Sequence, residues 1–261
     1  MLDSLTASMQ VNEESRNNCI SQLQNCREYL NHDTGEISFS GYLKNLKVYT
    51  SGDWLNISGS IPKYYKGNNC VNLSMDELTE ALNQLSEDLG VDTSHFKVKR
   101  FDVSYTFAMT YHPANYFQML IHHPRTEANS FNRGENGIQF VNQSITLSFY
   151  DKLREMGKKI KALDFITVAN LLRYEWQQKR YVERVFGCKL LVADFMNPDI
   201  WERLIEKYKE RYRKTIRSLQ FGNAQIEELD QIVESIVLVK SYRDDNSYIS
   251  RFTFDGGTYS E

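Results

Sequence analysis

The sequence has few prolines, few glycines, few cysteines and no long apolar run, and each shortage excludes a class of protein. Only 4 prolines and 13 glycines occur among its 261 residues, so no Pro- or Gly-rich linker divides the chain. The apolar runs fall far short of the roughly 20 residues that a membrane-spanning helix needs. The first residues lack the basic and apolar stretches of a secretion signal. We therefore expect no membrane partner and a cytoplasmic location.

The 4 cysteines have a spacing that fits no zinc site. A chain of this length buries enough apolar surface to form a core without disulfides, so we expect reduced thiols. Hydrophobic residues make up 41% of the chain and charged residues 25%, as in ordinary globular proteins. This composition excludes a collagen, a coiled-coil rod and a mostly disordered chain, and it predicts one large domain or two small ones.

The net charge of −3 hides an uneven distribution. Residues 97–217 contain 22 lysines and arginines against 13 acidic residues, whereas residues 1–96 and 218–261 are acidic. A basic middle is consistent with a polyanionic partner. Basic helices are more often solvated surfaces, however, so the charge alone does not establish such a partner.

The hydrophobic pattern predicts an α+β fold: a central antiparallel sheet with helices on one face, an open polar face and a helical C-terminal region. Strands are expected over residues 37–49, 53–60, 97–110, 138–142, 144–150 and 171–179. Helices are expected over residues 74–90, 112–123, 151–160, 198–219 and 224–239. Ser74 and Glu77 form a capping box at the start of the first of these helices. Residues 124–137 are expected to be a polar loop.

The chain is predicted to consist of three parts. Residues 1–35 are a partly loose N-terminal segment with a helix around Cys19–Leu30, and residues 36–180 are the main α+β domain. Residues 181–261 are a helical region, either part of that domain or separate from it. The last stretch, Arg251–Glu261, reads like a strand cut short, which is consistent with a longer native chain.

Three of the predicted strands place polar side chains on one face, because alternate residues of a strand point to opposite sides. The polar sets contain Arg100 and Asp102 on the first strand, Tyr150 on the second, and Arg173, Glu175 and Lys179 on the third. A plain antiparallel sheet with one wet side shows the same alternation. If the three strands are neighbours, Asp102, Glu175 and Tyr150 project from the same open face. Two carboxylates on adjacent strands repel each other unless a cation lies between them, and oxygen ligands of this kind suit Mg²⁺ or Mn²⁺.

Ordered landmarks then resemble a known family. They are Gly41–Val48, Ser58–Tyr64 followed by Gly67–Asn69, the acidic strand Val98–Val103, a Tyr-x-Lys-x-x-Glu element at Tyr150–Glu155 and a Leu-Arg-aromatic-Glu element at Leu172–Glu175. In this order they resemble the gene II/X-type replication initiators of filamentous phages and related plasmids, which start rolling-circle replication. The His-hydrophobe-His metal motif of many rolling-circle initiators is missing from the sequence, and we interpret His122-His123 as a helix terminus.

The resemblance implies that the 36–180 domain is an origin-specific DNA nickase and strand transferase with Tyr150 as its nucleophile. The phenol would attack a phosphodiester, leaving a 5′-phosphotyrosyl enzyme and a free 3′-hydroxyl. Because the ordinary pKa of tyrosine is near 10, a neighbour must favour the phenolate, and Lys152 is our candidate. Asp102 and Glu175 would hold the Mg²⁺ or Mn²⁺ ion that polarises the phosphate.

Further residues are assigned roles in metal or DNA binding. Glu155 is either a third metal ligand or a group that orients Lys152. Arg100 and Arg173 either clamp phosphate or neutralise the neighbouring carboxylates. The remaining expected DNA contacts are Lys179, Arg180, Lys209 and Arg213. The last two belong to a basic segment, Lys207–Arg217, that could instead be a solvated helix.

The implied partners are origin DNA, as supercoiled duplex and as single strand, and the host helicase and polymerase in the bacterial cytoplasm. Two other functions fit parts of the same pattern. The first is an origin-binding regulator of phage or plasmid replication without catalysis. The second is a structural or interaction protein whose basic middle is incidental.

Overall fold

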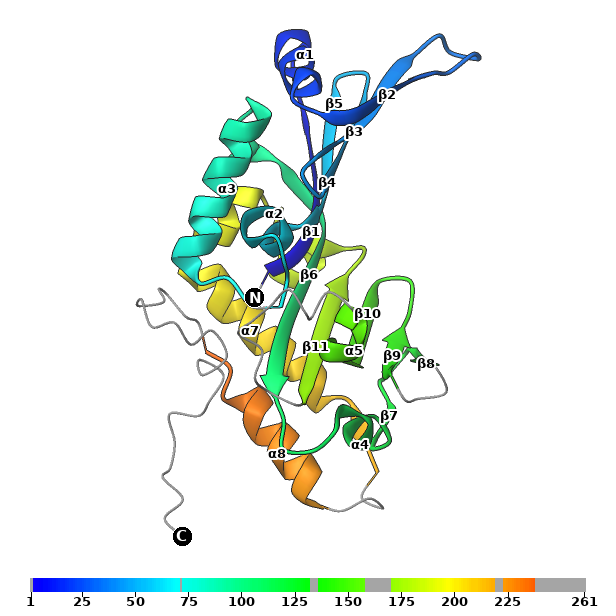
Figure 1. Ribbon diagram of the computed structural model, residues 1–261, viewed down its shortest axis with the longest axis vertical. Helices are drawn as coiled ribbons and strands as arrows, with labels where there is room; N and C mark the ends of the chain where they lie inside the picture. The colour runs from blue at the N-terminus through cyan, green and yellow to red at the C-terminus, as the bar shows by residue number, and fades with distance from the viewer. Residues whose placement is uncertain (1, 71, 132–135, 158–169, 219–222, 238–261) are drawn as a thin grey trace.

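A single large antiparallel sheet forms the centre of the fold in the computed structural model, which describes residues 2–70, 72–131, 136–157, 170–218 and 223–237 (Figure 1). Its ten strands, in spatial order, are β2 (Gln24–Leu30), β3 (Ile37–Leu43), β4 (Leu46–Ser51), β5 (Trp54–Ser60), β1 (Leu2–Gln10), β6 (Lys97–Ala108), β11 (Leu171–Gln178), β10 (Ile145–Asp151), β9 (Gly137–Val141) and β8 (Glu127–Phe131). Each neighbouring pair is antiparallel. A separate small ladder joins β7 (Leu120–His122) to β12 (Ile216–Arg217). The prediction of an α+β fold with an antiparallel sheet is confirmed.

The helices of the described residues are mostly short, except for three. They are α1 (Glu13–Ser21), α2 (Ile61–Lys66), α3 (Met75–Leu89), α4 (Pro113–Phe117), α5 (Lys152–Met156), α6 (Val182–Phe186), α7 (Pro198–Arg213) and α8 (Asn223–Glu234), with two 3₁₀ turns at Thr93–His95 and Val192–Met196. α3 begins with the predicted capping box of Ser74 and Glu77 and ends at Gly90, which adopts a left-handed conformation. α7 and α8 confirm the helical C-terminal part. No helix among the described residues is long and apolar enough to cross a membrane.

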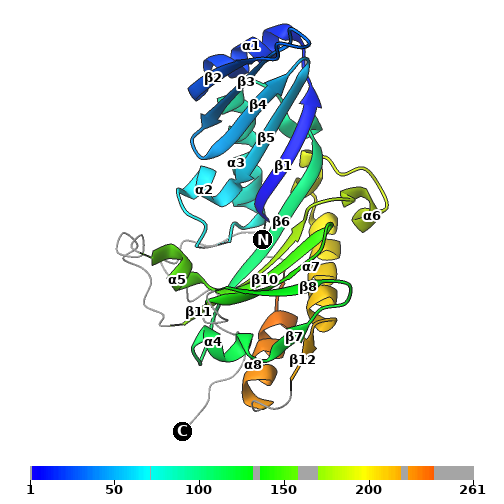
Figure 2. The ribbon, with the colours of Figure 1, turned by 90° about the vertical axis from the view of Figure 1, so that its right-hand side faces the viewer.

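The apolar face of the sheet packs against helices and forms the core. Phe101 and Trp176, on the neighbouring strands β6 and β11, meet edge to face with ring centroids 5.2 Å apart. Tyr208 of α7 lies over this face, with its ring centroid 4.2 Å from that of Tyr174. The hydroxyl of Tyr208 donates to the backbone oxygen of Tyr174 over 2.8 Å, so its polar end is satisfied inside the core. Figure 2 shows α6 and α7 on this side of the sheet and α5 on the other.

The three strands with the polar pattern are neighbours, in the order β6-β11-β10. In the register of the sheet, Arg173 pairs with Tyr150 of β10, and Glu175 pairs with Ser148 of β10 and Ser104 of β6. Asp102 pairs with the next polar position of β11, Gln177. Because paired residues point to the same side, Tyr150, Glu175 and Asp102 share one face, as predicted.

This polar face is less open than predicted. Asp102, Ser104, Thr106, Arg173 and Glu175 are all buried. Part of the cover comes from the loop after α2, because Arg173 donates from Nη1 to the backbone oxygen of Asn69 over 2.7 Å. The buried polar groups must therefore satisfy one another, which makes the face a hydrogen-bonded network instead of a solvated surface.

The N-terminal residues differ most from the prediction. The structure places β1 in the interior of the sheet, between β5 and β6, instead of in a loose segment (Figure 1). The helix predicted around Cys19–Leu30 is wrong, since α1 ends at Ser21 and Gln24–Leu30 is β2. The division of the chain into residues 1–35, 36–180 and 181–261 stays a prediction.

Other boundaries also shift. The strand predicted over residues 37–49 is two strands, β3 and β4, because Lys44 adopts a left-handed conformation (φ 53°) and reverses the chain. The helix predicted over 112–123 ends at Phe117, and the polar loop predicted over 124–137 contains β8. Three predicted helices are shorter than expected: α5 ends at Met156, α7 at Arg213 and α8 at Glu234, and Ile216–Arg217 is the strand β12. Residues 158–160, 219 and 238–239 of these predictions lie outside the described residues. The predicted C-terminal strand Arg251–Glu261 also lies outside them.

Candidate active site

Tyr150 lies at the end of β10 on the polar face and is half-buried. Its hydroxyl donates a hydrogen bond to Glu175 Oε2 over 3.1 Å. The other oxygen of this carboxylate, Oε1, accepts a hydrogen bond from Gln177 Nε2 over 2.7 Å. The predicted nucleophile and one predicted acid are thus in direct contact, and the acid is held in place from its far side.

A cavity of about 340 Å³ opens directly over this pair. Its lining includes Tyr150 and Glu175 together with Gln139, Ser148 and Glu155. Gln139 and Ser148, on neighbouring strands, hydrogen-bond to each other over 3.1 Å, so the polar wall is itself ordered. A polar cavity that exposes a hydroxyl and its proton acceptor has the form of a candidate active site.

Burial raises the pKa of the Tyr150 phenol, and the carboxylate of Glu175 raises it further, whereas the guanidinium of Arg173 opposes them. The free protein therefore holds Tyr150 as a neutral phenol at pH 7. We predicted from the sequence that Lys152 favours the phenolate. In the structure, however, the ammonium of Lys152 lies 6.0 Å from the centre of the Tyr150 ring. The group in contact with the phenolic proton is Glu175.

Arg173 lies behind this pair and is almost completely buried, with 2% of its surface exposed. Its Nη2 atom lies 3.0 Å from Asp3 Oδ2, and its Nε atom lies 3.7 Å from Glu175 Oε2. The guanidinium also donates to the hydroxyls of Ser104 and Thr106. Of the two roles left open for Arg173, this geometry favours neutralisation of carboxylates, because a phosphate could reach the guanidinium only by displacing them.

Asp102 is buried and pairs with Arg100, whose side chain is 40% exposed. Arg100 donates to Asp102 Oδ1 from Nε over 2.9 Å and to Oδ2 from Nη2 over 2.6 Å. Burial raises the pKa of Asp102 to about 6, although Arg100 acts against that rise. Both oxygens of this predicted metal ligand are therefore occupied by the predicted phosphate clamp, Arg100.

Lys152 and Glu155 form a third pair at the edge of the cavity. Lys152 is the first residue of α5 and does not continue β10. Its side chain therefore does not follow the alternation that places Tyr150 on the polar face. Its buried ammonium donates to Glu155 Oε2 over 2.7 Å and to Asn69 Oδ1 over 3.2 Å. Burial lowers the pKa of Lys152, and Arg173 lowers it further, whereas Glu155 raises it. Of the two roles left open for Glu155, the contact favours orientation of Lys152.

The three predicted metal ligands do not form a preformed metal site in this arrangement. Asp102 is bound by Arg100, Glu155 by Lys152, and Glu175 by Tyr150 and Gln177. No group of three or more His, Cys, Asp or Glu residues within the described parts of the chain could hold a metal ion. Arginine side chains supply the positive charge that we expected between acidic residues on adjacent strands.

The other predicted DNA contacts are distributed over different surfaces. Lys209 and Arg213, on α7, face α8, where Lys209 Nζ donates to the Glu234 backbone oxygen and Arg213 pairs with the Glu234 carboxylate at 2.6 Å. Lys179 Nζ donates to the backbone oxygen of Asn142 over 2.6 Å. Arg180 is exposed just beyond the end of β11. None of these four lines the cavity at Tyr150.

Sequence reasoning missed two residues of this network. Asp3 pairs with Arg173 from a bulged part of β1, where the register with β6 shifts between Leu2 and Ser4. Asn69 contacts Arg173 and Lys152 from the loop after α2. Neither residue lies in a periodic pattern, and the only available signal was the position of Asn69 within the Gly67–Asn69 landmark.

The chain matches a known protein family. Residues 1–192 match the family model Phage_CRI, which describes the N-terminal region of a replication-associated protein of the gene II type. This range includes β1, all three strands of the polar face and α5, and thus every residue in contact with Tyr150 or Arg173 described above. No curated protein matches the chain.

Proposed function

The chain belongs to the Phage_CRI family of replication-associated proteins, which are phage replication initiators of the gene II type, and from this premise we propose that it initiates replication by nicking one DNA strand at the origin. A role in replication initiation implies binding to origin DNA. The proposal adds the chemistry: Tyr150 as nucleophile and a covalent 5′-phosphotyrosyl intermediate. The contact that supports it best is the 3.1 Å hydrogen bond from the Tyr150 hydroxyl to Glu175 inside a polar cavity.

In the proposed step, Tyr150 Oη attacks the phosphorus of a phosphodiester. The phenolic proton passes to Glu175 Oε2, which already accepts its hydrogen bond. The bond between phosphorus and the 3′-oxygen breaks, and that oxygen leaves with the bonding pair and takes a proton from water. The products are a free 3′-hydroxyl and a phosphotyrosyl bond to the 5′ side. The phosphotyrosyl bond stores the energy of the broken phosphodiester for later rejoining.

Residues behind the pair act as positioning residues. Gln177 holds the second oxygen of Glu175, and Arg173 places a positive charge 3.7 Å from the first. This fixes the proton acceptor before DNA arrives, so little reorganisation is needed during the step. Arg173 also lowers the pKa of Tyr150, against the larger effect of burial.

A requirement for Mg²⁺ or Mn²⁺ stays part of the expectation from the resemblance. The carboxylates named as its ligands are engaged by Arg100, Lys152 and Tyr150, so the attack and the proton transfer described above rest on Tyr150 and Glu175 alone. The proposed partners follow from the product: a free 3′-hydroxyl is a primer for a host polymerase, and a nicked duplex is a substrate for a host helicase. These steps would take place in the host cytoplasm.

The experiment is to incubate the full chain with supercoiled origin DNA, with Mg²⁺ or Mn²⁺ added, and to measure both nicking and protease-sensitive covalent adduct. Tyr150→Phe keeps the ring and removes the hydroxyl, so we expect it to bind DNA normally and to form no adduct. Tyr49→Phe, at an exposed tyrosine of β4, is the matched control and should nick like the wild type. If Tyr150→Phe nicks as fast as the wild type, the assignment of Tyr150 is wrong. Origin binding by the wild type without any adduct would point instead to a regulator.

A further inference from the structure

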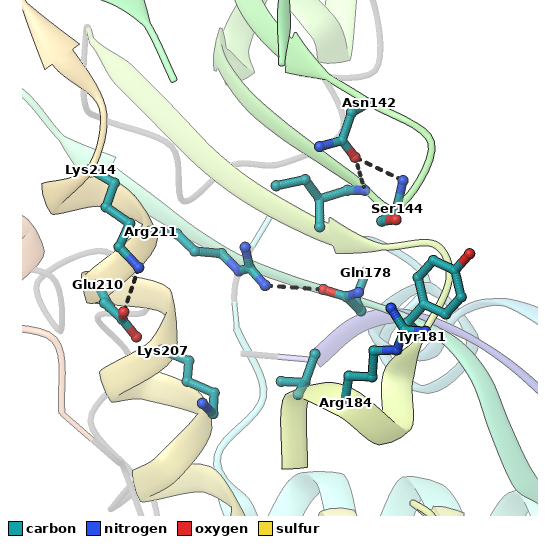
Figure 3. A pocket seen from close by; sticks show the side chains of 11 residues that line it. Asn142, Ser144, Gln178, Tyr181, Arg184, Lys207, Glu210, Arg211 and Lys214 are labelled. Carbon is teal, nitrogen blue, oxygen red and sulfur yellow. Dashed lines mark hydrogen bonds and ion pairs between the residues drawn. The ribbon is translucent and has the colours of Figure 1, made fainter. Parts of the chain in front are cut away.

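A second cavity, of about 360 Å³, is shown in Figure 3. It lies on the other side of the sheet from Tyr150. It is formed by α6, α7 and the strand ends at Ile145 of β10 and Gln178 of β11. Successive residues of a strand face opposite sides, so Gln178 points away from the face of Glu175, and Ile145 away from the face of Tyr150. The two cavities therefore belong to different surfaces of the protein.

The lining of this second cavity is strongly basic. It contains four cations, Arg184, Lys207, Arg211 and Lys214, against a single acid, Glu210. The acid is paired with Lys214 at 2.5 Å, which leaves the other three cations without that counter-charge. Lys207, Arg211 and Lys214 recur at intervals of four and three residues, which places them on one side of α7 (Figure 3).

Arg211 is the most constrained of these cations. Its guanidinium lies 4.3 Å from the centre of the Trp176 ring, and Nη2 donates to Gln178 Oε1 over 3.2 Å. Its Nε atom is buried and has no hydrogen-bond partner among the described residues. Burial lowers the pKa of Arg211, so holding this charge beside the cavity carries a desolvation cost. An anion in the cavity would offset that cost.

An aromatic residue stands at the mouth of the cavity. Tyr181 is 51% exposed and adopts a left-handed backbone conformation (φ 59°) immediately before α6. The guanidinium of Arg184 lies 4.1 Å from the centre of its ring, as Figure 3 shows from the side of the cavity. An exposed ring braced by arginine is the kind of platform on which a nucleic-acid base stacks.

The basic surface continues beyond this cavity. An adjoining hollow shares Tyr181 and Arg184 and is also lined by Lys97 and Lys99 of β6 and by Glu183, which forms an ion pair with Lys97. Lys99 Nζ lies 5.8 Å from the ring of Trp54, a second exposed aromatic residue. Basic side chains thus lie next to the exposed rings of Tyr181 and Trp54, a combination typical of proteins that bind single-stranded nucleic acid.

We propose that this helix-side pocket binds the phosphate backbone of single-stranded DNA, with Lys207, Arg211 and Arg184 as phosphate contacts and Tyr181 as a stacking platform. The inference rests on the proposed function for its choice of ligand. It assigns to the protein a DNA contact remote from the nicking site. Such a site would hold a strand on one face of the sheet while Tyr150 cuts on the other.

The test measures the affinity of the full chain for a fluorescein-labelled oligothymidylate by anisotropy over a range of salt concentrations. Lys207→Gln and Lys209→Gln are a matched pair, because each removes one lysine charge from α7. Lys207 lines the cavity, whereas Lys209, which we expected from the sequence to contact DNA, donates to a backbone oxygen of α8 and is excluded from the proposed contacts. We expect Lys207→Gln to weaken binding about fivefold at low salt and to reduce the salt slope by about 0.7, the value for one phosphate contact on a single strand. Lys209→Gln should change neither quantity. Tyr181→Ala should weaken binding about tenfold, which is within the range for loss of one stacked base.

Three outcomes would overturn the proposal: no binding of the oligonucleotide by the wild type, equal effects of Lys207→Gln and Lys209→Gln, or an effect of Lys207→Gln on duplex DNA alone. Tyr150→Phe separates the two hypotheses, because it should bind the oligonucleotide like the wild type. If the wild type forms the covalent adduct but Lys207→Gln binds normally, the pocket assignment fails and the nicking proposal stands. If no adduct forms but Lys207→Gln binds weakly, nicking fails and the pocket assignment stands.

Discussion

Arg173 and Asp3 form a buried ion pair, with Nη2 and Oδ2 3.0 Å apart, that joins β11 to the first strand of the chain. The same guanidinium lies 3.7 Å from Glu175, which accepts the hydrogen bond of the Tyr150 hydroxyl. Neither charge is accessible to water, since 2% of Arg173 and 6% of Asp3 is exposed. The network that positions the candidate active site is therefore also part of what holds β1 in the sheet.

The first prediction concerns the free energy of unfolding. Arg173→Gln should destabilise the protein by about 3–5 kcal/mol, because it leaves Asp3 buried without its cation. Urea unfolding, followed by circular dichroism, measures the change. Asp3→Asn alone should also destabilise the protein, but the double variant should lose less than the sum of the two single changes. Additive losses in this cycle would show that the pair contributes no coupling energy.

The second prediction concerns the dependence of stability on pH. Burial raises the pKa of Asp102 from 3.8 to about 6 in the folded protein. The folded state then holds this proton more tightly than the unfolded chain, so the contribution of Asp102 to stability is complete below about pH 4 and is lost as the pH rises through 6. Relative to Asp102→Asn, which does not titrate, the wild type should lose up to about 3 kcal/mol between pH 4 and 7.

Chemical denaturation of both proteins at several pH values checks this difference. Arg100→Gln is the companion variant, because Arg100 lowers the pKa of Asp102. Its removal should move the loss of stability to higher pH. A difference between the wild type and Asp102→Asn that stays constant from pH 4 to 7 would contradict the raised pKa.

The fold could be predicted for the strands and helices whose apolar residues recur regularly on one face. β6, β10 and β11 each bury one apolar face, and α3 carries its capping box and a leucine stripe, so their patterns are clear. β1 is different, because its register with β6 shifts between Leu2 and Ser4 and again between Thr6 and Ala7, and these irregularities interrupt the alternation. β2 has no buried residue at all, so its sequence carries no apolar pattern.

Some residues of the candidate site could likewise be predicted from the sequence, and others could not. Alternation along the strands brought Tyr150, Arg173 and Glu175 to one face, and their adjacency followed once the strands were neighbours. Asp3 and Asn69 could not be predicted, since a bulge and a loop place them there and neither leaves a periodic signal. The sequence also did not show which face of α7 is free, since Lys209 and Arg213 both contact Glu234 of α8 while Lys207 lines a cavity.

The third prediction concerns the proton acceptor. Glu175→Gln keeps an oxygen that can accept the Tyr150 hydrogen bond but cannot take up the proton at neutral pH. We expect the rate of adduct formation at saturating DNA to fall about 10²–10⁴-fold, the usual contribution of a general base, with DNA affinity unchanged. Gln177→Ala removes only a group that positions Glu175, so its rate should fall by less than about tenfold. Equal rates for Glu175→Gln and the wild type would exclude Glu175 as the base.

The last prediction separates binding of a metal by the free protein from any requirement for metal during nicking. The carboxylates of Asp102, Glu155 and Glu175 are each engaged by Arg100, Lys152 or Tyr150, so a metal ion would have to displace these donors. Without DNA, about 5 mM Mg²⁺ should therefore add less than about 0.5 kcal/mol to the free energy of unfolding, as for a site with a Kd above about 4 mM. Thermal unfolding with Mg²⁺ and with EDTA measures this, and Glu175→Gln is the control. A larger stabilisation that Glu175→Gln abolishes would show that the free protein rearranges to form a metal site around Glu175.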